Sequence, residues 1–133
     1  MAKFTPMGPI QVDKAANQSG YYWLAMPANG HWRIDRVDFA PCETTPLHAS
    51  NYVTCQVLVN DGLGGDDVLI ASHNTSTTGG QPFVVNRTIR VHMSGSEELR
   101  TLKAGQGLKV QNVPTGAGAK WRGAYTISLT ELP

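Results

Sequence analysis

Apolar and polar residues alternate along several stretches of the chain, a pattern typical of β-strands with one buried face. It is clearest over residues 53–59 and 125–129, where apolar side chains occupy the odd positions. Residues 83–93 predict one long strand, because their apolar residues share one face that only Arg87 interrupts. The short apolar run at residues 68–70 predicts another strand, and Leu108 and Val110 begin one more.

A β-hairpin is predicted over residues 21–39. Residues 21–26 alternate, and Asn29-Gly30 is a strong signal for a primed two-residue turn. On the return strand the apolar residues change from even positions to odd ones at Asp35-Arg36. A β-bulge there would explain the change, and so would a strand that passes from one sheet to another.

Residues 96–103 are the only helix candidate. Ser96 could cap it, and Glu97 and Glu98 would favour its first turn. Eight residues before Gly105 predict a single turn or an irregular connection. With about seven or eight strands and no helix long enough for a crossover between parallel strands, we expect an all-β fold. The predicted architecture is an antiparallel, jelly-roll-like β-sandwich with an extended N-terminal arm.

The arm is predicted at residues 1–20, and residues 21–133 are expected to form a single β-sandwich domain. Pro6 and Pro9 interrupt a regular ladder, while Phe4, Met7 and Ile10 are apolar without helical spacing. Such an arm could lie on its own domain, on a sister subunit or on a different protein. The alternative for the first few residues is a disordered terminus.

Composition narrows the function classes. The 133 residues suit one domain, and only 16% of them are charged, against roughly 25% in typical globular domains. A net charge of +1 argues against a general nucleic-acid binder and against a polybasic membrane anchor. The first residues lack the apolar core of a signal peptide, and no run approaches the roughly 18 apolar residues of a membrane helix. We therefore expect a soluble protein that is synthesised in a cytoplasm.

Catalytic and metal-binding patterns are missing. No nucleophile elbow, zinc-protease helix, phosphate loop or dinucleotide fingerprint occurs. Glu97 and Glu98 are adjacent, so they make a poor glycosidase pair. A metal enzyme of the double-stranded β-helix type could use His31, Asp35 and His92, but their spacing does not fit that class. We expect no enzyme activity, no cofactor and no metal.

Two local features keep alternatives open. Residues 60–69 look like one copy of a glycine-rich calcium repeat, with Asp61, Asp66 and Asp67 as oxygen donors. Because that family binds calcium between stacked repeats, a glycine-rich loop with solvated carboxylates is the favoured interpretation. Cys42 and Cys55 could pair under oxidising conditions, although reduced, packed thiols are expected for a protein made inside a cell.

Taken together, the layout resembles the small jelly-roll cement (decoration) proteins on the capsids of tailed bacteriophages. The segments that carry the resemblance lie at residues 30–37, 99–110 and 124–129. The resemblance implies a virion protein on the capsid exterior that bridges major capsid protein subunits and forms a homo-oligomer with other copies of itself. It also implies partner contacts at Phe4, Met7 and Ile10 of the arm and at Trp121.

A second functional class is a carbohydrate- or receptor-binding jelly-roll module, such as part of a phage tail fibre. Aromatic side chains could form its sugar-stacking platform, although most of them are expected in the core or at subunit interfaces. The candidates are Tyr21, Tyr22, Trp23, Trp32, Tyr52, Trp121 and Tyr125.

Overall fold

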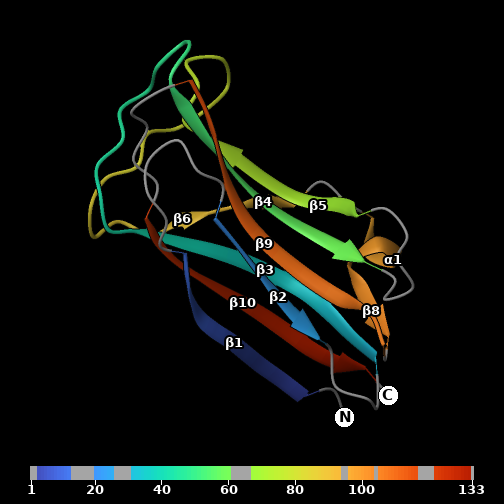
Figure 1. Cartoon of the computed structure of the whole chain (residues 1–133). Coiled ribbons are helices and arrows are strands. Elements are labelled where there is room, and N and C mark those ends of the chain that lie inside the picture. Colours follow the sequence, from blue (N-terminus) through green and yellow to red (C-terminus); the bar gives the residue numbers. More distant parts are fainter. Residues whose placement is uncertain are drawn as a thin grey trace.

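Two antiparallel β-sheets pack face to face in the computed structural model of the chain (Figure 1). The structure describes residues 3–12, 20–25, 31–60, 67–93, 96–103, 105–116 and 122–132. Sheet A contains β1 (Lys3–Val12), β10 (Gly123–Leu132), β3 (His31–Pro41) and β6 (Ile89–Arg90), and β8 (Thr101–Lys103) also pairs with β3. Sheet B contains β2 (Gly20–Ala25), β9 (Gly107–Thr115), β4 (Tyr52–Asn60), β5 (Val68–Asn74) and β7 (His92–Met93).

The strands pair in a nested order. The first strand pairs with the last, β1 with β10, and the second pairs with the last but one, β2 with β9. Inside these, β3 pairs with β6 and β8, and β4 pairs with β5. Nested pairing across two sheets is the winding of a jelly roll. The predicted all-β antiparallel sandwich is confirmed.

The backbone of the predicted arm takes part in this winding. Residues 3–12 form β1, which pairs with β10 from Lys3 opposite Glu131 to Val12 opposite Gly123. Of the three surfaces on which the arm could lie, this strand lies on its own domain. β1 is an edge strand of sheet A, a position that tolerates Pro6 and Pro9 because a proline lacks the N–H that a ladder on both sides would need.

The core lies between the sheets and is built from the apolar positions of the alternating strands. In β4 these are Val53, Cys55, Val57 and Val59, all buried, as the period of two predicted. An aromatic cluster fills one part of the core: the Phe39 ring centroid lies 5.1 Å from that of Phe83 and 4.8 Å from that of Tyr125. This cluster joins the two central strands of sheet A to the connection between β5 and β6.

A β-bulge explains the change of apolar positions in β3. Arg36 pairs with Ser128 and Ile34 pairs with Leu129, so Asp35 is the extra residue. Ile34 and Val37 are both fully buried although they lie three positions apart. The bulge alternative of the sequence prediction is therefore confirmed, and β3 stays in one sheet along its length.

The predicted hairpin over residues 21–39 is wrong. β2 belongs to sheet B and β3 belongs to sheet A, so the two strands do not pair with each other. The Asn29-Gly30 turn itself lies outside the described residues. A turn sequence indicates that the chain can reverse its direction locally, but it does not indicate that the two flanking strands pair in the same sheet.

The predicted long strand over residues 83–93 is also wrong. Phe83 makes an isolated bridge with Thr45, and Asn86 has a positive φ of 64°. The chain then forms β6 in sheet A and crosses at Val91 to form β7 in sheet B. The apolar residues that predict this strand occupy odd positions, as they would in one strand. In the structure, however, Ile89 belongs to sheet A and Met93 to sheet B, and the sequence pattern does not distinguish these two cases.

The only helix in the described part of the chain is the single turn α1 (Glu97–Arg100). The Ser96 hydroxyl caps it by accepting a hydrogen bond from the Leu99 N–H at 3.4 Å. The single-turn alternative of the prediction is confirmed.

Candidate binding surface

The outward-facing residues of β4, β5 and β9 form a broad face that carries little charge. We call it the outer face of sheet B. The register places Gln56 between Gln111 on β9 and Ser72 on β5, and Leu58 between Lys109 and Leu69. The Gln111 amide donates a hydrogen bond of 2.6 Å to the Gln56 carbonyl, which joins the two central strands on this face. The described residues of the outer face of sheet B are Thr54, Gln56, Leu58, Leu69, Ser72, Asn74, Lys109, Gln111 and Val113.

The one charged residue in this set is Lys109, and it lies close to a carboxylate. Its Nζ is 3.7 Å from Asp67 Oδ2, and its side chain is only 18% exposed. Asp67 Oδ1 accepts a further hydrogen bond of 2.9 Å from the Asn60 amide. The charge on this face is therefore neutralised at its edge.

The outer face of sheet A is different, because charged side chains line it along β3. Arg33 pairs with Asp35 at 2.7 Å, Arg36 pairs with Asp38 at 2.8 Å, and Arg90 lies 3.8 Å from Asp38. Partial burial raises the pKa of Asp35, but hydrogen bonds from Thr130 and Arg33 outweigh that effect and lower the pKa overall. These charged groups are thus paired with one another on the outer face of sheet A.

The two outer faces therefore differ in the cost of covering them with another protein. Burial of sheet A would remove several ionised groups from water, which is costly unless each finds a new partner. The outer face of sheet B presents mostly amides, hydroxyls and aliphatic side chains, and the cores of protein interfaces are likewise depleted of charged residues. Covering the outer face of sheet B would therefore remove fewer ionised groups from water than covering the outer face of sheet A.

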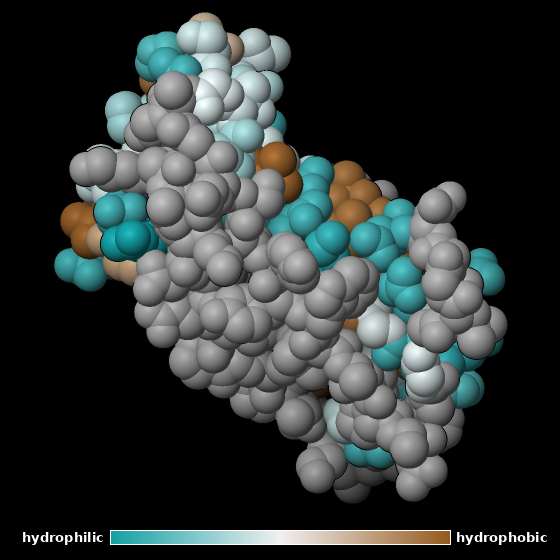
Figure 2. Space-filling view, in the orientation of Figure 1, coloured by the Kyte–Doolittle hydropathy of each residue, from teal (hydrophilic) through white to brown (hydrophobic). Residues whose placement is uncertain are grey.

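Exposed apolar residues extend this face toward α1. Leu69 is 39% exposed, and the adjacent Val68 is 41% exposed. Val68 and the exposed Leu99 of α1 both line a groove of about 480 Å³. In Figure 2, hydrophobic surface lies over β5 beside hydrophilic surface. Exposed apolar side chains therefore lie at the α1 end of the candidate surface, in a groove that Glu98 and Lys103 also line.

The predicted contact residues lie elsewhere. The backbone register places Phe4, Met7 and Ile10 of β1 opposite Thr130, Ile127 and Tyr125 of β10. Trp121 lies outside the described residues, as do Asp61 and Asp66 of the possible calcium loop. The outer face of sheet B was not identified from the sequence. The alternation within β4 predicts which of its residues face outward. It does not predict that outward-facing residues of β5 and β9 lie beside them, because that depends on long-range strand pairing.

The histidines are not assembled into a metal site in the described part of the chain, where no group of three His, Cys, Asp or Glu side chains could hold an ion. His48 Nδ1 accepts hydrogen bonds from the Ser50 and Asn51 N–H groups, at 3.1 and 2.9 Å. The ring of His73 stacks on Phe83, and burial lowers the pKa of His73. Asp35 and His92 line one pocket, but together with His31 they form no group that could hold an ion, and the Asp35 carboxylate accepts hydrogen bonds from Arg33 and Thr130.

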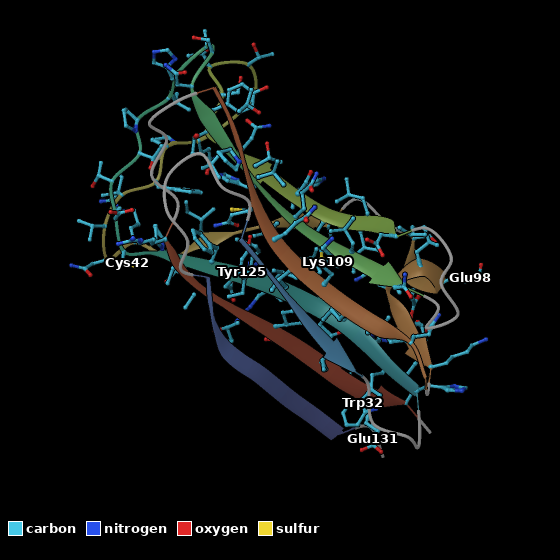
Figure 3. The ribbon with its side chains drawn as sticks, in the orientation of Figure 1. Trp32, Cys42, Glu98, Lys109, Tyr125 and Glu131 are labelled. Carbon is cyan, nitrogen blue, oxygen red and sulfur yellow. The ribbon has the colours of Figure 1, made fainter. Side chains whose placement is uncertain are left out.

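Two titratable groups are sealed in the core. Burial raises the pKa of Cys55 to about 12 and raises the pKa of Tyr125 well above its usual value. The Tyr125 hydroxyl donates to Asn112 Oδ1 on the opposite sheet, and Figure 3 shows Tyr125 between the sheets. Both groups are closed off from solvent, and the hydrogen bond from Tyr125 to Asn112 joins the two sheets.

The two cysteines are free, and they differ in accessibility: Cys42 is exposed and Cys55 is buried. We therefore expect a thiol reagent to modify one cysteine per native chain at about pH 8, because a buried thiol with a raised pKa is unreactive. Mass spectrometry of the native protein after brief treatment with iodoacetamide checks this. The Cys42→Ser variant should take up no label until it is unfolded, and fast labelling of Cys55 in that variant would contradict the buried position.

Comparison with known proteins gives no family. No protein-family model matches the chain, and no curated protein matches it. Among solved structures, the chain is similar to a CocE/NonD family hydrolase from Staphylococcus aureus, with a TM-score of 0.42 and 9% sequence identity over 98% of this chain. The chain spans 32% of the length of that hydrolase. This structural likeness is too weak to assign a family or an activity.

No helix in the described part of the chain is long and apolar enough to cross a membrane.

Proposed function

We propose that this protein is a non-catalytic structural protein of a phage virion, which binds the outside of the capsid and bridges major capsid protein subunits. The observation that carries the proposal is the difference in charge between the two outer faces of the sandwich. The outer face of sheet B has one charged residue in its described set, and that residue is paired with Asp67. The resemblance of the chain to capsid cement proteins supplies the identity of the partner.

The physical basis is many weak contacts that act together. A contact that buries little area binds weakly, so we expect one copy to bind one subunit weakly. Contacts to two neighbouring subunits, or between copies in a homo-oligomer, would raise the overall affinity because the second contact becomes intramolecular. The arm residues Phe4, Met7 and Ile10, on the edge strand β1 of sheet A, and Trp121 would then contact a neighbouring subunit or copy rather than the subunit covered by sheet B.

Introducing a charge on the proposed face should weaken capsid binding. Thr54 lies on the central strand β4 and faces outward, opposite Val113 and Asn74. A lysine there would have to be desolvated in the interface, so we expect Thr54→Lys to weaken binding about tenfold or more. The measurement is co-sedimentation of the purified protein with capsids of the encoding phage that lack it.

Thr126→Lys is the matched control. Thr126 lies on the central strand β10 of sheet A, opposite Asp38 and on the outer face. The same substitution there should change capsid affinity by no more than about threefold. Equal loss of binding in both variants, with both folded, would contradict the assignment of the face. Failure of the wild-type protein to bind capsids, with tryptophan-dependent binding on a glycan array, would favour the carbohydrate-binding alternative.

A further inference from the structure

A gap interrupts the edge of sheet A beside β3. On that side β3 pairs with β8 as far as Arg33, and it pairs with β6 only from Asp38 onward. Between these two points, Arg100 Nη1 donates to the Ile34 carbonyl at 3.1 Å, and the Val91 N–H donates to the Val37 carbonyl at 2.9 Å. The gap exists because the chain leaves sheet A after Arg90 and enters sheet B at His92.

Two arginines stand at the gap and share one carboxylate. Arg36 Nε lies 2.8 Å from Asp38 Oδ2, and Arg90 Nε lies 3.8 Å from Asp38 Oδ1. The Asp38 carboxylate therefore lies on the Nε side of both guanidinium groups. Within the described part of the chain, the Nη groups of Arg36 and Arg90 make no hydrogen bond, and the two side chains are 48% and 68% exposed. Each arginine thus presents an unused pair of donors to solvent.

The gap is also a pocket of about 340 Å³. Arg36, Arg90 and the exposed His92 form its polar rim, and Val37, Val91 and Met93 form its apolar floor. Asp35 also lines the pocket, but its charge is balanced by Arg33. Since Asp38 balances only one of the two rim arginines, the pocket retains a net positive charge.

We propose that this pocket binds a carboxylate group of a polypeptide, either an acidic side chain or a chain terminus. Guanidinium groups bind carboxylates through paired, charge-assisted hydrogen bonds, and the Nη donors of Arg36 and Arg90 are available for such bonds. The volume is at the low end of ligand pockets, so it suits one such group with the aliphatic atoms next to it. This proposal is independent of the capsid role, because the pocket lies between β3 and the crossing from β6 to β7, and none of its lining residues belongs to the outer face of sheet B.

Titration of the full-length, ¹⁵N-labelled protein by two-dimensional NMR tests the proposal. The probes are N-acetyl-glutamate amide for a side-chain carboxylate and N-acetyl-alanine for a terminal one. N-acetyl-glutamine amide is the neutral control, and inorganic phosphate is the competing anion. We expect saturable shifts, confined to the amides of residues 35–38 and 89–93, with at least one of the two carboxylates and not with the glutamine compound. Comparison of the two carboxylates distinguishes the two sources.

Arg90→Gln should weaken binding about tenfold or more, because it removes one of the two donor groups from the rim. Arg87→Gln is the matched control: it removes the same charge from an exposed residue that does not line the pocket, and it should change the affinity by no more than about twofold. The NMR spectrum reports directly that each variant is folded. Four results would overturn the proposal: no shift with either carboxylate, equal binding of the glutamine compound, unchanged binding in Arg90→Gln, or binding of phosphate alone.

Discussion

Replacement of Phe39 by alanine is expected to lower the free energy of unfolding by about 3–5 kcal/mol. Phe39 is fully buried in β3, and its ring packs against both Phe83 and Tyr125. The backbone of β10 closes over the same ring at Gly123, where any side chain would collide with the ring of Phe39. Because side chains and backbone from several segments surround the ring, the structure collapses only partly when it is removed, and a cavity remains.

Chemical denaturation followed by circular dichroism measures this loss. Leu47→Ala is the control, because Leu47 is 40% exposed and its truncation should cost less than about 0.5 kcal/mol. If Phe39→Ala cost no more than Leu47→Ala, the aromatic cluster would not be the centre of the core.

The second large effect is expected for Tyr125→Phe, at about 1–3 kcal/mol. The Tyr125 hydroxyl donates to Asn112 Oδ1, and it lies 3.2 Å from the Gln111 carbonyl. Asn112 is fully buried on β9, so its side-chain oxygen would lose this donor in a place that water does not reach. The cost arises from the loss of this buried hydrogen bond rather than from lost volume, because phenylalanine fills almost the same space.

Tyr52→Phe is the matched control for this experiment. Tyr52 is half-buried at the start of β4, and its hydroxyl makes no hydrogen bond within the described part of the chain. The same deletion of one oxygen atom should change stability by less than about 0.5 kcal/mol there. Equal effects at the two positions, measured by the same denaturation, would show that the hydrogen bond between the sheets contributes nothing.

The local pattern predicted much of the fold. The alternation over residues 53–59 became β4, and the change of parity at Asp35-Arg36 became a bulge. The capping by Ser96 and the single turn after it were also predicted correctly. Each of these features depends on residues that are close in the sequence, where the period of two and the chemistry of caps act directly.

The remaining features depend on long-range pairing. Residues 21–25 and 31–39 alternate as a hairpin would, but they pair with β9 and β10 from the other end of the chain. Residues 83–93 keep one apolar parity while the chain passes from sheet A to sheet B. The gap beside β3 and the outer face of sheet B exist only because of these pairings. For the same reason, Arg36, Arg90 and Gln111 gave no signal in the sequence, since none of them belongs to a motif.

The central claim is that this jelly roll is a docking protein whose sheet B faces a capsid. Cryo-electron microscopy of capsids that lack the protein, incubated with an excess of it, tests that claim most directly. We expect additional density on the outside of the shell at symmetry-related positions, into which the sandwich fits with β4 and β9 toward the capsid subunits. Bare shells at saturating concentrations of folded protein, or copies bound with the charged outer face of sheet A against the shell, would contradict it.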